Sequence, residues 1–363
     1  MNTYNLKLIH TALDFDYVDT FSEGLAYVCK NGLIGFIDMT GEIVIPLGLY
    51  DNINQKTMFN MRYIFKDGLS PAVKNNKCGF INKSGEVVIP MKYDTVSSFC
   101  EGLAAAKKDN KWGFINRFGE EVIPFIYDFV QSFSEDIAVV KKDNKFGCIG
   151  KDGKTIIELN ENYNHIEPFH EGVAVVITNR KDLPTLNREK NESKNDFLIR
   201  TSLEVKEKTK DEKYGIIDKT GQLVLPFEYS YLSSFYNEIA VSEKNGSTNY
   251  INKKGHILSF PKFDEYGCFY NGFAWVKKNK KCGCIDKIGK LVIPLKYDNN
   301  FIVVKEGLAT VKINDCWGCV DIEGNTVIPL KYEYISTPEN KTIITKKGSK
   351  WEIYTIDFHQ KKW

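Results

Sequence analysis

Along the chain, short apolar runs alternate with short polar segments. One copy of the pattern begins with the run Leu103–Lys107, continues with Trp112–Ile115 and ends with Val122–Pro124. Polar segments separate these runs, and short apolar runs bounded by turn residues are typical of β-strands. The pattern therefore predicts a three-stranded antiparallel meander, whose strands we call A, B and C.

The same unit recurs about nine times along the chain. A step of the Glu-Gly-Leu type precedes strand A, and its second residue gives anchors at Gly24, Gly68, Gly102, Asp136, Gly172, Glu238, Gly272, Gly307 and, degenerately, Thr342. Most neighbouring anchors lie 34 or 35 residues apart. Two longer intervals indicate a short insertion at 51–66, between repeats 1 and 2, and a charged insertion at 178–212 in repeat 5. We therefore predict a single repeat array over 1–363 rather than two or three unrelated domains.

The link between strands B and C carries the clearest local signal. In seven units an Asp or Asn stands three residues before a Gly, at Asp38/Gly41, Asn82/Gly85, Asn116/Gly119, Asp218/Gly221, Asn252/Gly255, Asp286/Gly289 and Asp321/Gly324. The Asx side chain caps backbone amides, and the Gly supplies the positive φ that closes a bulged hairpin. These turns predict that strands B and C pair as a hairpin.

Both faces of strand B are apolar, because Trp112 and Phe114 point to one side and Gly113 and Ile115 to the other. A unit that cannot bury both faces alone is stabilised by stacking on its neighbours. The Gly that follows the aromatic residue is expected to let an adjacent backbone or ring approach closely.

The two ends of the chain fit two architectures. A weak strand C candidate lies around Leu8–Thr11, and the chain closes on a strand B equivalent at Trp351–Tyr354. An N-terminal strand that completes the last unit would close a β-propeller-like ring, whereas two degenerate caps would end an open superhelix. The period of 34 to 35 residues is short for four-stranded blades of about 40–45 residues. We therefore favour an all-β fold of about nine three-stranded meanders stacked into an open or superhelical solenoid.

The residues from Lys111 to Asp128 resemble the WG-repeat (KWG-repeat) family of bacterial proteins. Lys-Trp-Gly-Phe-Ile-Asn is followed there by Gly-Glu-Glu-Val-Ile-Pro and Tyr-Asp. The resemblance covers nearly the whole chain apart from the two insertions, and it implies an interaction module without an assigned activity. The Trp position holds other residues in several units, at Ile34, Cys78, Phe146, Tyr214, Thr248 and Cys282.

Composition narrows the classes of function. The 363 residues include 49 basic and 47 acidic side chains, so the net charge gives no overall attraction to nucleic acid or anionic membrane. No stretch approaches the about 18 apolar residues of a membrane span, and the N-terminus lacks signal-peptide features. Nine cysteines, an odd number, indicate reduced thiols. We expect a cytoplasmic protein that binds an unidentified protein partner.

Three sets of side chains are candidates for chemistry. Cysteines 282, 284, 316 and 319 have short, zinc-like spacings, but the opposite parity of Cys316 favours core packing. The five histidines are dispersed. Acidic residues recur before strand A and after strand C, and this recurrence favours turn capping over acid–base catalysis. They are Glu23, Glu101, Glu135, Glu171, Glu238 and Glu306, and Asp16, Asp51, Asp94, Asp128, Asp264 and Asp298. We expect no catalytic residue, no cofactor and no metal.

Two recurrent features bear on binding. The repeated aromatic residues are expected in the core; exposed rings that stack on a glycan are the alternative. Lysines precede strand B at Lys77, Lys111, Lys145, Lys213 and Lys281. Lysine on an exposed strand discourages pairing between sheet edges, and contact with a nucleic-acid backbone is the alternative.

The insertion at 178–212 is the segment that the repeat does not explain. Its many charges and its single aromatic residue, Phe197, are typical of a chain that cannot bury enough surface to order itself. The alternative is a projecting arm that extends strands A and B, with Arg188, Phe197, Leu198 and Arg200 as candidate partner-binding residues. The sequence predicts a non-enzymatic protein-interaction scaffold, with a glycan- or cell-wall-binding module as the alternative.

Overall fold

Every regular element of the structure is a β-strand. This computed structural model describes residues 3–51, 63–178 and 212–359, and no helix occurs among them. The chain divides into two compact units, Met1–Ile126 with Phe260–Trp363, and Tyr127–Ser259. The all-β prediction is therefore confirmed.

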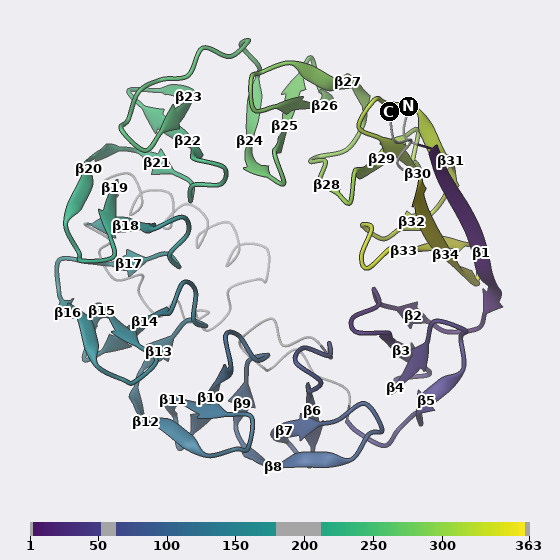
Figure 1. The fold of residues 1–363 in the computed structure, drawn as a ribbon, viewed down its shortest axis with the longest axis horizontal. Coiled ribbons are helices and arrows are strands. Elements are labelled where there is room, and N and C mark those ends of the chain that lie inside the picture. Colours follow the sequence, from purple (N-terminus) through teal and green to yellow (C-terminus); the bar gives the residue numbers. More distant parts are fainter. Residues whose placement is uncertain (1–2, 52–62, 179–211, 360–363) are drawn as a thin grey trace, which may run out of the picture. The chain divides into compact units, whose positions relative to one another are not determined.

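The strands form nine small antiparallel sheets that follow one another along the chain (Figure 1). Sheets 1 to 3 consist of β2 (Tyr17–Val18), β3 (Leu25–Lys30), β4 (Leu33–Asp38) and β5 (Ile43–Ile45); β6 (Ser70–Lys74), β7 (Lys77–Ile81) and β8 (Val87–Tyr93); and β9 (Thr95–Val96), β10 (Leu103–Lys108), β11 (Lys111–Asn116) and β12 (Glu121–Tyr127). Sheets 4 to 6 consist of β13 (Phe129–Val130), β14 (Ile137–Lys142), β15 (Lys145–Gly150) and β16 (Thr155–Asn160); β17 (His165–Ile166), β18 (Val173–Thr178), β19 (Lys213–Asp218) and β20 (Leu223–Tyr229); and β21 (Tyr231–Leu232), β22 (Ile239–Lys244) and β23 (Ser247–Asn252). Sheets 7 to 9 consist of β24 (Glu265–Tyr270), β25 (Phe273–Lys278), β26 (Lys281–Asp286) and β27 (Leu291–Tyr297); β28 (Val304–Lys305), β29 (Leu308–Ile313), β30 (Cys316–Asp321) and β31 (Thr326–Tyr332); and β32 (Tyr334–Ile335), β33 (Thr342–Lys347) and β34 (Lys350–His359), which β1 (Thr3–Leu13) completes.

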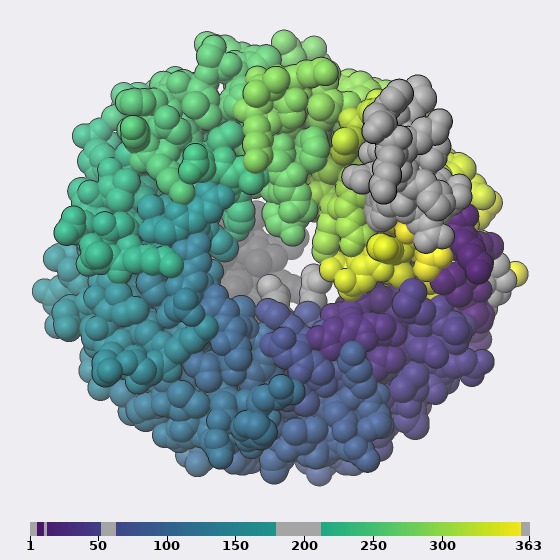
Figure 2. Space-filling view, in the orientation of Figure 1, coloured from purple at the N-terminus to yellow at the C-terminus, as the bar shows by residue number. Residues whose placement is uncertain are grey.

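The N-terminal strand β1 closes the array. It pairs antiparallel with β34 from Thr3 opposite His359 to Leu13 opposite Trp351. Figure 1 shows β1 beside β34, and Figure 2 shows the purple N-terminal and yellow C-terminal surfaces packed together. A first strand that completes the last sheet is the closure of a β-propeller, so the predicted open or superhelical solenoid is wrong. The nine sheets are blades of the β-propeller type, and we number the blades as the sheets above.

A fourth strand, which the repeat pattern did not reveal, precedes strands A, B and C in most blades. β9, for example, is only two residues long and pairs with β10 through Val96 and Ala106. In the described parts of the chain, seven sheets have four strands and two have three, so the predicted three-stranded meander is wrong for most units. Because the first strand is so short, four strands fit within the short repeat period. The degenerate anchor of the last unit is Lys341, with φ 61°, rather than Thr342.

The turns between the third and fourth strands form as predicted. In the first blade Asp38 Oδ1 accepts hydrogen bonds from the amides of Thr40 and Glu42, at 2.8 and 3.1 Å, and Gly41 has a φ of 84°. The other six predicted Asx residues, at positions 82, 116, 218, 252, 286 and 321, accept equivalent bonds. The Asx and Gly chemistry therefore confirms the hairpin prediction.

The core lies between neighbouring blades, as the stacking argument predicts. One cluster joins Ile34 and Phe36 of blade 1 to Phe65 and Ile81 of blade 2. Another joins blade 1 to blade 9, where Trp351 and Ile353 belong to the same cluster as Val18 and Phe21 of blade 1. Within each of the two units, consecutive blades thus bury their apolar faces against each other, and blades 9 and 1 do the same across the closure.

Candidate interaction surfaces

Each blade presents two edges made of loops. We call "hairpin edge" the end that holds the turn between the second and third strands, such as Lys108–Lys111 in blade 3, and the link after the fourth strand, which begins at Asp94. We call "loop edge" the opposite end, which holds the Glu-Gly loop, such as Glu101–Gly102, and the Asx turn. The antiparallel order of the strands fixes this assignment in every blade.

The aspartates that follow the fourth strand cap the hairpin edge. Asp16 accepts a hydrogen bond from the amide of Asn31 at 2.6 Å, and Asp298 accepts one from Asn314 at 3.0 Å. Asp51, Asp94, Asp128 and Asp264 bind the hairpin amides of residues 75, 110, 143 and 279 in the same way. The Lys281 ammonium, 2.5 Å away, lowers the pKa of Asp298. Turn capping is therefore confirmed for this set of carboxylates.

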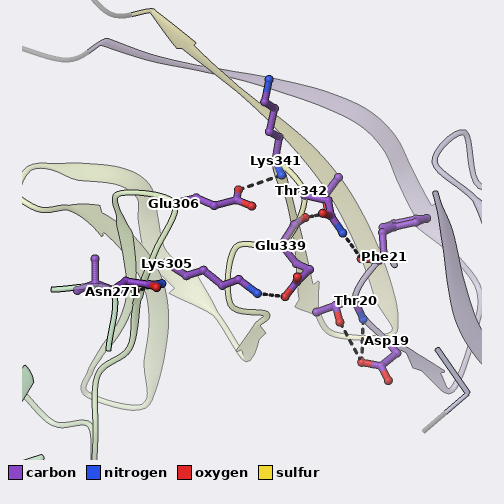
Figure 3. A network of polar contacts seen from close by, with 11 residues as sticks. Asp19, Thr20, Phe21, Asn271, Lys305, Glu306, Glu339, Lys341 and Thr342 are labelled. Atoms are coloured by element: carbon purple, nitrogen blue, oxygen red, sulfur yellow. Dashed lines mark hydrogen bonds and ion pairs between the residues drawn. The ribbon is translucent and has the colours of Figure 1, made fainter. Parts of the chain in front are cut away.

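The glutamates of the loop edge do something else: they join one blade to the next. Glu306 adopts a left-handed conformation, with φ 52°, and accepts a hydrogen bond from the Lys341 amide of blade 9 at 2.9 Å (Figure 3). Glu23 binds the Gly68 amide at 3.1 Å, Glu135 the Gly172 amide at 2.9 Å, and Glu171 the Glu238 amide at 2.7 Å. These carboxylates cap the neighbouring blade, not their own turn.

A second set of junction bonds runs through backbone carbonyls and crosses the closure. Asn271 of blade 7 donates to the Val304 carbonyl of blade 8 at 3.3 Å, and Asn340 of blade 9 donates to the Phe21 carbonyl of blade 1 at 3.1 Å. Lys305 and Glu339 form an ion pair between blades 8 and 9 (Figure 3). The junction from the last blade to the first therefore resembles the junction between consecutive blades.

Cations of the Asx turns complete these junctions, and the sequence analysis did not identify them. Lys83 lies 3.2 Å from Glu23, Lys219 lies 3.0 Å from Glu135 and Lys253 lies 3.5 Å from Glu171. Although burial opposes the shift, the hydrogen bonds from Lys219 and the Gly172 amide lower the pKa of Glu135. A Lys or Arg directly after the Asx recurs at 83, 117, 219, 253 and 287, and Lys151 follows Gly150 at the equivalent position. This recurrence is the signal that would have revealed them.

The lysines before strand B do not protect an exposed edge. Strand β7 lies between β6 and β8, and β26 lies between β25 and β27, so neither has a free edge. The edge-protection interpretation is therefore wrong. Lys77 instead contacts Asp94 at 2.7 Å, and Lys281 contacts Asp298, so these lysines belong to the capped hairpin edge.

The repeated Trp position is mostly buried. Trp112 is 4% exposed and Trp351 is 3% exposed, and the replacements Ile34, Cys78, Phe146 and Cys282 are buried as well. Tyr214 and Trp317 are half-buried, and Thr248 is exposed. The expectation of core aromatics is therefore confirmed for most units, and the buried rings offer no face on which a glycan can stack.

The cysteine group packs in the core. Cys282, Cys284 and Cys319 are buried, whereas Cys316 is exposed at the hairpin edge of blade 8. Burial raises the pKa of Cys282 to about 11 and that of Cys319 to about 12. In the described part of the chain, no three His, Cys, Asp or Glu side chains are grouped so as to hold a metal ion.

Thiol labelling checks this packing. We expect Cys268 and Cys316, which are exposed, to react with a disulfide reagent at pH 7.5 at least about a hundredfold faster than the buried Cys78, Cys148, Cys282, Cys284 and Cys319. The buried thiols have raised pKa values and therefore little thiolate. Peptide mass mapping after timed quenching measures each rate. Fast reaction of the buried group in the native protein would contradict core packing.

The structure brings two histidines of the Tyr127–Ser259 unit into polar contacts that spacing could not reveal. His165 lies 3.4 Å from Glu167 and lowers the pKa of that carboxyl. His170 Nε2 lies 3.3 Å from the Tyr236 hydroxyl. The first pair lies within blade 5, and the second joins blade 5 to blade 6.

The long insertion begins and ends at the hairpin edge of its blade, and the short insertion begins at the hairpin edge. Thr178 pairs with Lys213, and its hydroxyl donates to the Lys213 carbonyl at 3.3 Å, so the long insertion is rooted between β18 and β19. Asp51, whose carbonyl accepts a bond from the Tyr63 hydroxyl, forms the root of the short one. Positions 52–62 and 179–211 lie outside the described residues, and with them the candidates Arg188, Phe197, Leu198 and Arg200.

Comparisons with known proteins agree with this repeat architecture. A family model described as "WG containing repeat" matches residues 12–33, 34–78, 79–112, 112–146, 146–181, 214–246, 250–282, 283–315 and 317–351. No curated protein matches the chain by sequence. Among residues 3–51, 63–178 and 212–359, no helix has the length and apolarity needed to cross a membrane.

Solved structures show a likeness of fold alone. A crystal structure of a eukaryotic initiation factor is 10% identical, with 86% of each chain covered and a TM-score of 0.54. Hsv2 of Kluyvelomyces marxianus is also 10% identical, with 98% of this chain and 99% of that chain covered, but its TM-score is only 0.37.

Proposed function

The chain belongs to the WG-containing repeat family, and we propose that it is a non-enzymatic, cytoplasmic scaffold that binds a protein partner. We further propose that the insertion at 178–212 supplies specificity for that partner. The blades would serve as the support and the insertion as the variable element, since binding loops are often grafted on rigid repeats.

The observation that carries this proposal is that recurrent polar side chains cap turns and join neighbouring blades. Asp298 caps a hairpin, Glu306 binds the next blade and Lys219 neutralises Glu135. The repeated carboxylates, and the lysines that contact them, are thus committed to the architecture. The hairpin of β18 and β19 departs most from the repeat, and its root remains paired through Thr178 and Lys213.

Excision of the insertion tests the proposal. We replace residues 179–212 by Asp-Asn, the two residues that turn the hairpins of β10/β11 and β14/β15 at 109–110 and 143–144. The blade should keep its fold, with a melting temperature within a few degrees of the parent protein, because the paired root is retained. Partners captured from the native host and identified by mass spectrometry should be lost.

The shorter insertion supplies the matched control. A variant in which residues 52–62 are replaced by a short Gly-Ser link should fold and retain the same partners. Unchanged capture by the variant lacking 179–212 would contradict the role of the long insertion, and equal loss in both variants would contradict its specificity.

A further inference from the structure

Four hairpins of the unit Met1–Ile126 with Phe260–Trp363 place a lysine directly opposite a lysine. The opposed pairs are Lys74 with Lys77, Lys108 with Lys111, Lys278 with Lys281, and Lys347 with Lys350. Like charges directly opposite each other destabilise an antiparallel pair. A repeated arrangement that costs stability indicates that the charges act on something outside the hairpin.

The turns between the opposed lysines add almost no negative charge. The turn residues between the opposed lysines are 75–76, 109–110, 279–280 and 348–349, and they include one acid, Asp109, and one more lysine, Lys280. The loop edge of blades 2 and 3 carries both signs, with Asp67 and Glu101 beside Lys83 and Arg117. The near balance of 49 basic and 47 acidic residues therefore conceals a local concentration of lysine at these hairpins.

The first lysine of each pair is exposed to solvent. These residues are Lys74, Lys108, Lys278 and Lys347. The nearby carboxylates of Asp94 and Asp298 engage the second lysine of a pair and the hairpin amides. The acids of this edge thus hold the turns and leave the first lysines at the surface.

We propose that this lysine face, Lys74, Lys108, Lys278 and Lys347, docks on the anionic phospholipid headgroups of a membrane surface. Clusters of four to eight basic residues are typical of binding to anionic lipids. Lysine is a point charge that suits phosphates in any orientation, whereas the fork of arginine, absent from these hairpins, suits directed recognition.

Two features favour a membrane over a nucleic acid. The turns between the opposed lysines hold no aromatic side chain on which bases can stack. The hairpins extend from the same edge of several blades of one unit, so the charges are spread over a broad face and do not line a groove. With no large apolar residue in these turns to insert, the binding should be reversible and sensitive to salt.

Sedimentation of the full-length protein with vesicles tests the proposal. We expect binding to vesicles of phosphatidylcholine and phosphatidylglycerol in a 70:30 ratio, no binding to phosphatidylcholine alone, and release at high salt. Each lysine near an anionic surface contributes about fivefold. The variant K74Q/K108Q/K278Q/K347Q should therefore bind several hundredfold more weakly. Its thermal stability should be unchanged or higher, because each replacement relieves an opposed pair.

A variant with the same change in charge at the loop edge is the control. K66Q/K254Q/K287Q/K290Q replaces four exposed lysines there and should bind vesicles like the parent protein. Equal weakening by both variants would overturn the proposal in favour of net charge. Failure of the parent protein to bind the anionic vesicles would also overturn it, as would tighter binding of a 30-base-pair DNA duplex at equal phosphate concentration. Partner capture through 179–212 is measured separately and does not depend on this result.

Discussion

A chain that lacks Met1–Leu13 is expected to lose its cooperative folded state. β1 is the fourth strand of blade 9, and its removal exposes the edge of β34 and the cluster in which Leu13 packs on Trp351 and Ile353. Large apolar side chains contribute about 1.5–3 kcal/mol each when fully buried. The expected loss exceeds about 5 kcal/mol, a large part of the about 5–15 kcal/mol that stabilises a typical domain. Calorimetry and dye binding to exposed apolar surface measure it.

A circular permutant separates the pairing of β1 from its place in the chain. Thr3 lies opposite His359, so residues 1–13 can follow residue 363 through a short Gly-Ser linker in a chain that begins at residue 14. This permutant should melt within a few degrees of the parent protein. A stable deletion variant would show that the closure contributes little, and a permutant as unstable as the deletion would show that the strand acts only as an N-terminal extension.

The sequence suggested that an N-terminal strand could pair with the last repeat, but it could not show that the two strands do pair. The strand candidate around Leu8–Thr11 and the strand at Trp351–Tyr354 are both visible, yet their pairing joins residues separated by almost the whole chain. The short repeat period argued against four-stranded blades. The extra strand escaped detection because a strand of two residues, such as β9, is too short to show a hydrophobic period. Local chemistry, in contrast, predicted every Asx turn, since the cap and the Gly lie within one turn.

The junctions between blades show a second limit of sequence reasoning. Glu306 looks like a turn residue because its partner, the Lys341 amide, lies in the next repeat. Recurrence alone gives the same carboxylate two explanations, a cap on its own turn or a contact to a neighbour. Only the positions of the blades in space distinguish them. The four opposed lysine pairs are hidden for the same reason, because register is needed to place each lysine opposite its partner.

The absence of a fourth strand from the described residues of blade 6 is visible in the sequence. This blade has three strands, and Asn249 stands where seven of the other eight blades have the Gly of the Trp-Gly step. Blade 9 has Glu352 at this position, opposite the register shift of β1 between His10 and Leu13. The apolar residue at the buried position of the fourth strand, Ile123 in blade 3, is replaced by Ser259 in blade 6. In the described residues of blade 6 the fourth strand does not form, so no carbonyl of such a strand crowds the third strand and a side chain is tolerated.

That comparison predicts a large effect of Gly113→Ala. A Cβ on Gly113 would lie 2.5 Å from the Ile123 carbonyl oxygen and 2.9 Å from the Pro124 carbonyl carbon, both backbone atoms of β12. The φ of Gly113 is outside the left-handed region, so the cost is steric. Because the fourth strand cannot yield without losing its pairing, we expect a loss of about 3 kcal/mol, at the upper end of overpacking effects. Denaturant-induced unfolding measures this loss.

Gly102→Asn is the matched control, because its cost is conformational. Gly102 has a φ of 86°, and a Cβ at this position would have no other atom within 4 Å. The equivalent positions hold Asp136, Glu238 and Lys341 with φ between 61° and 67°. Asn tolerates this conformation, so we expect a loss of about 1 kcal/mol or less. Equal losses in the two variants would contradict the steric role of Gly113. A small loss at Gly113 alone would show that β12 can shift away, and the Trp-Gly step would then need another explanation.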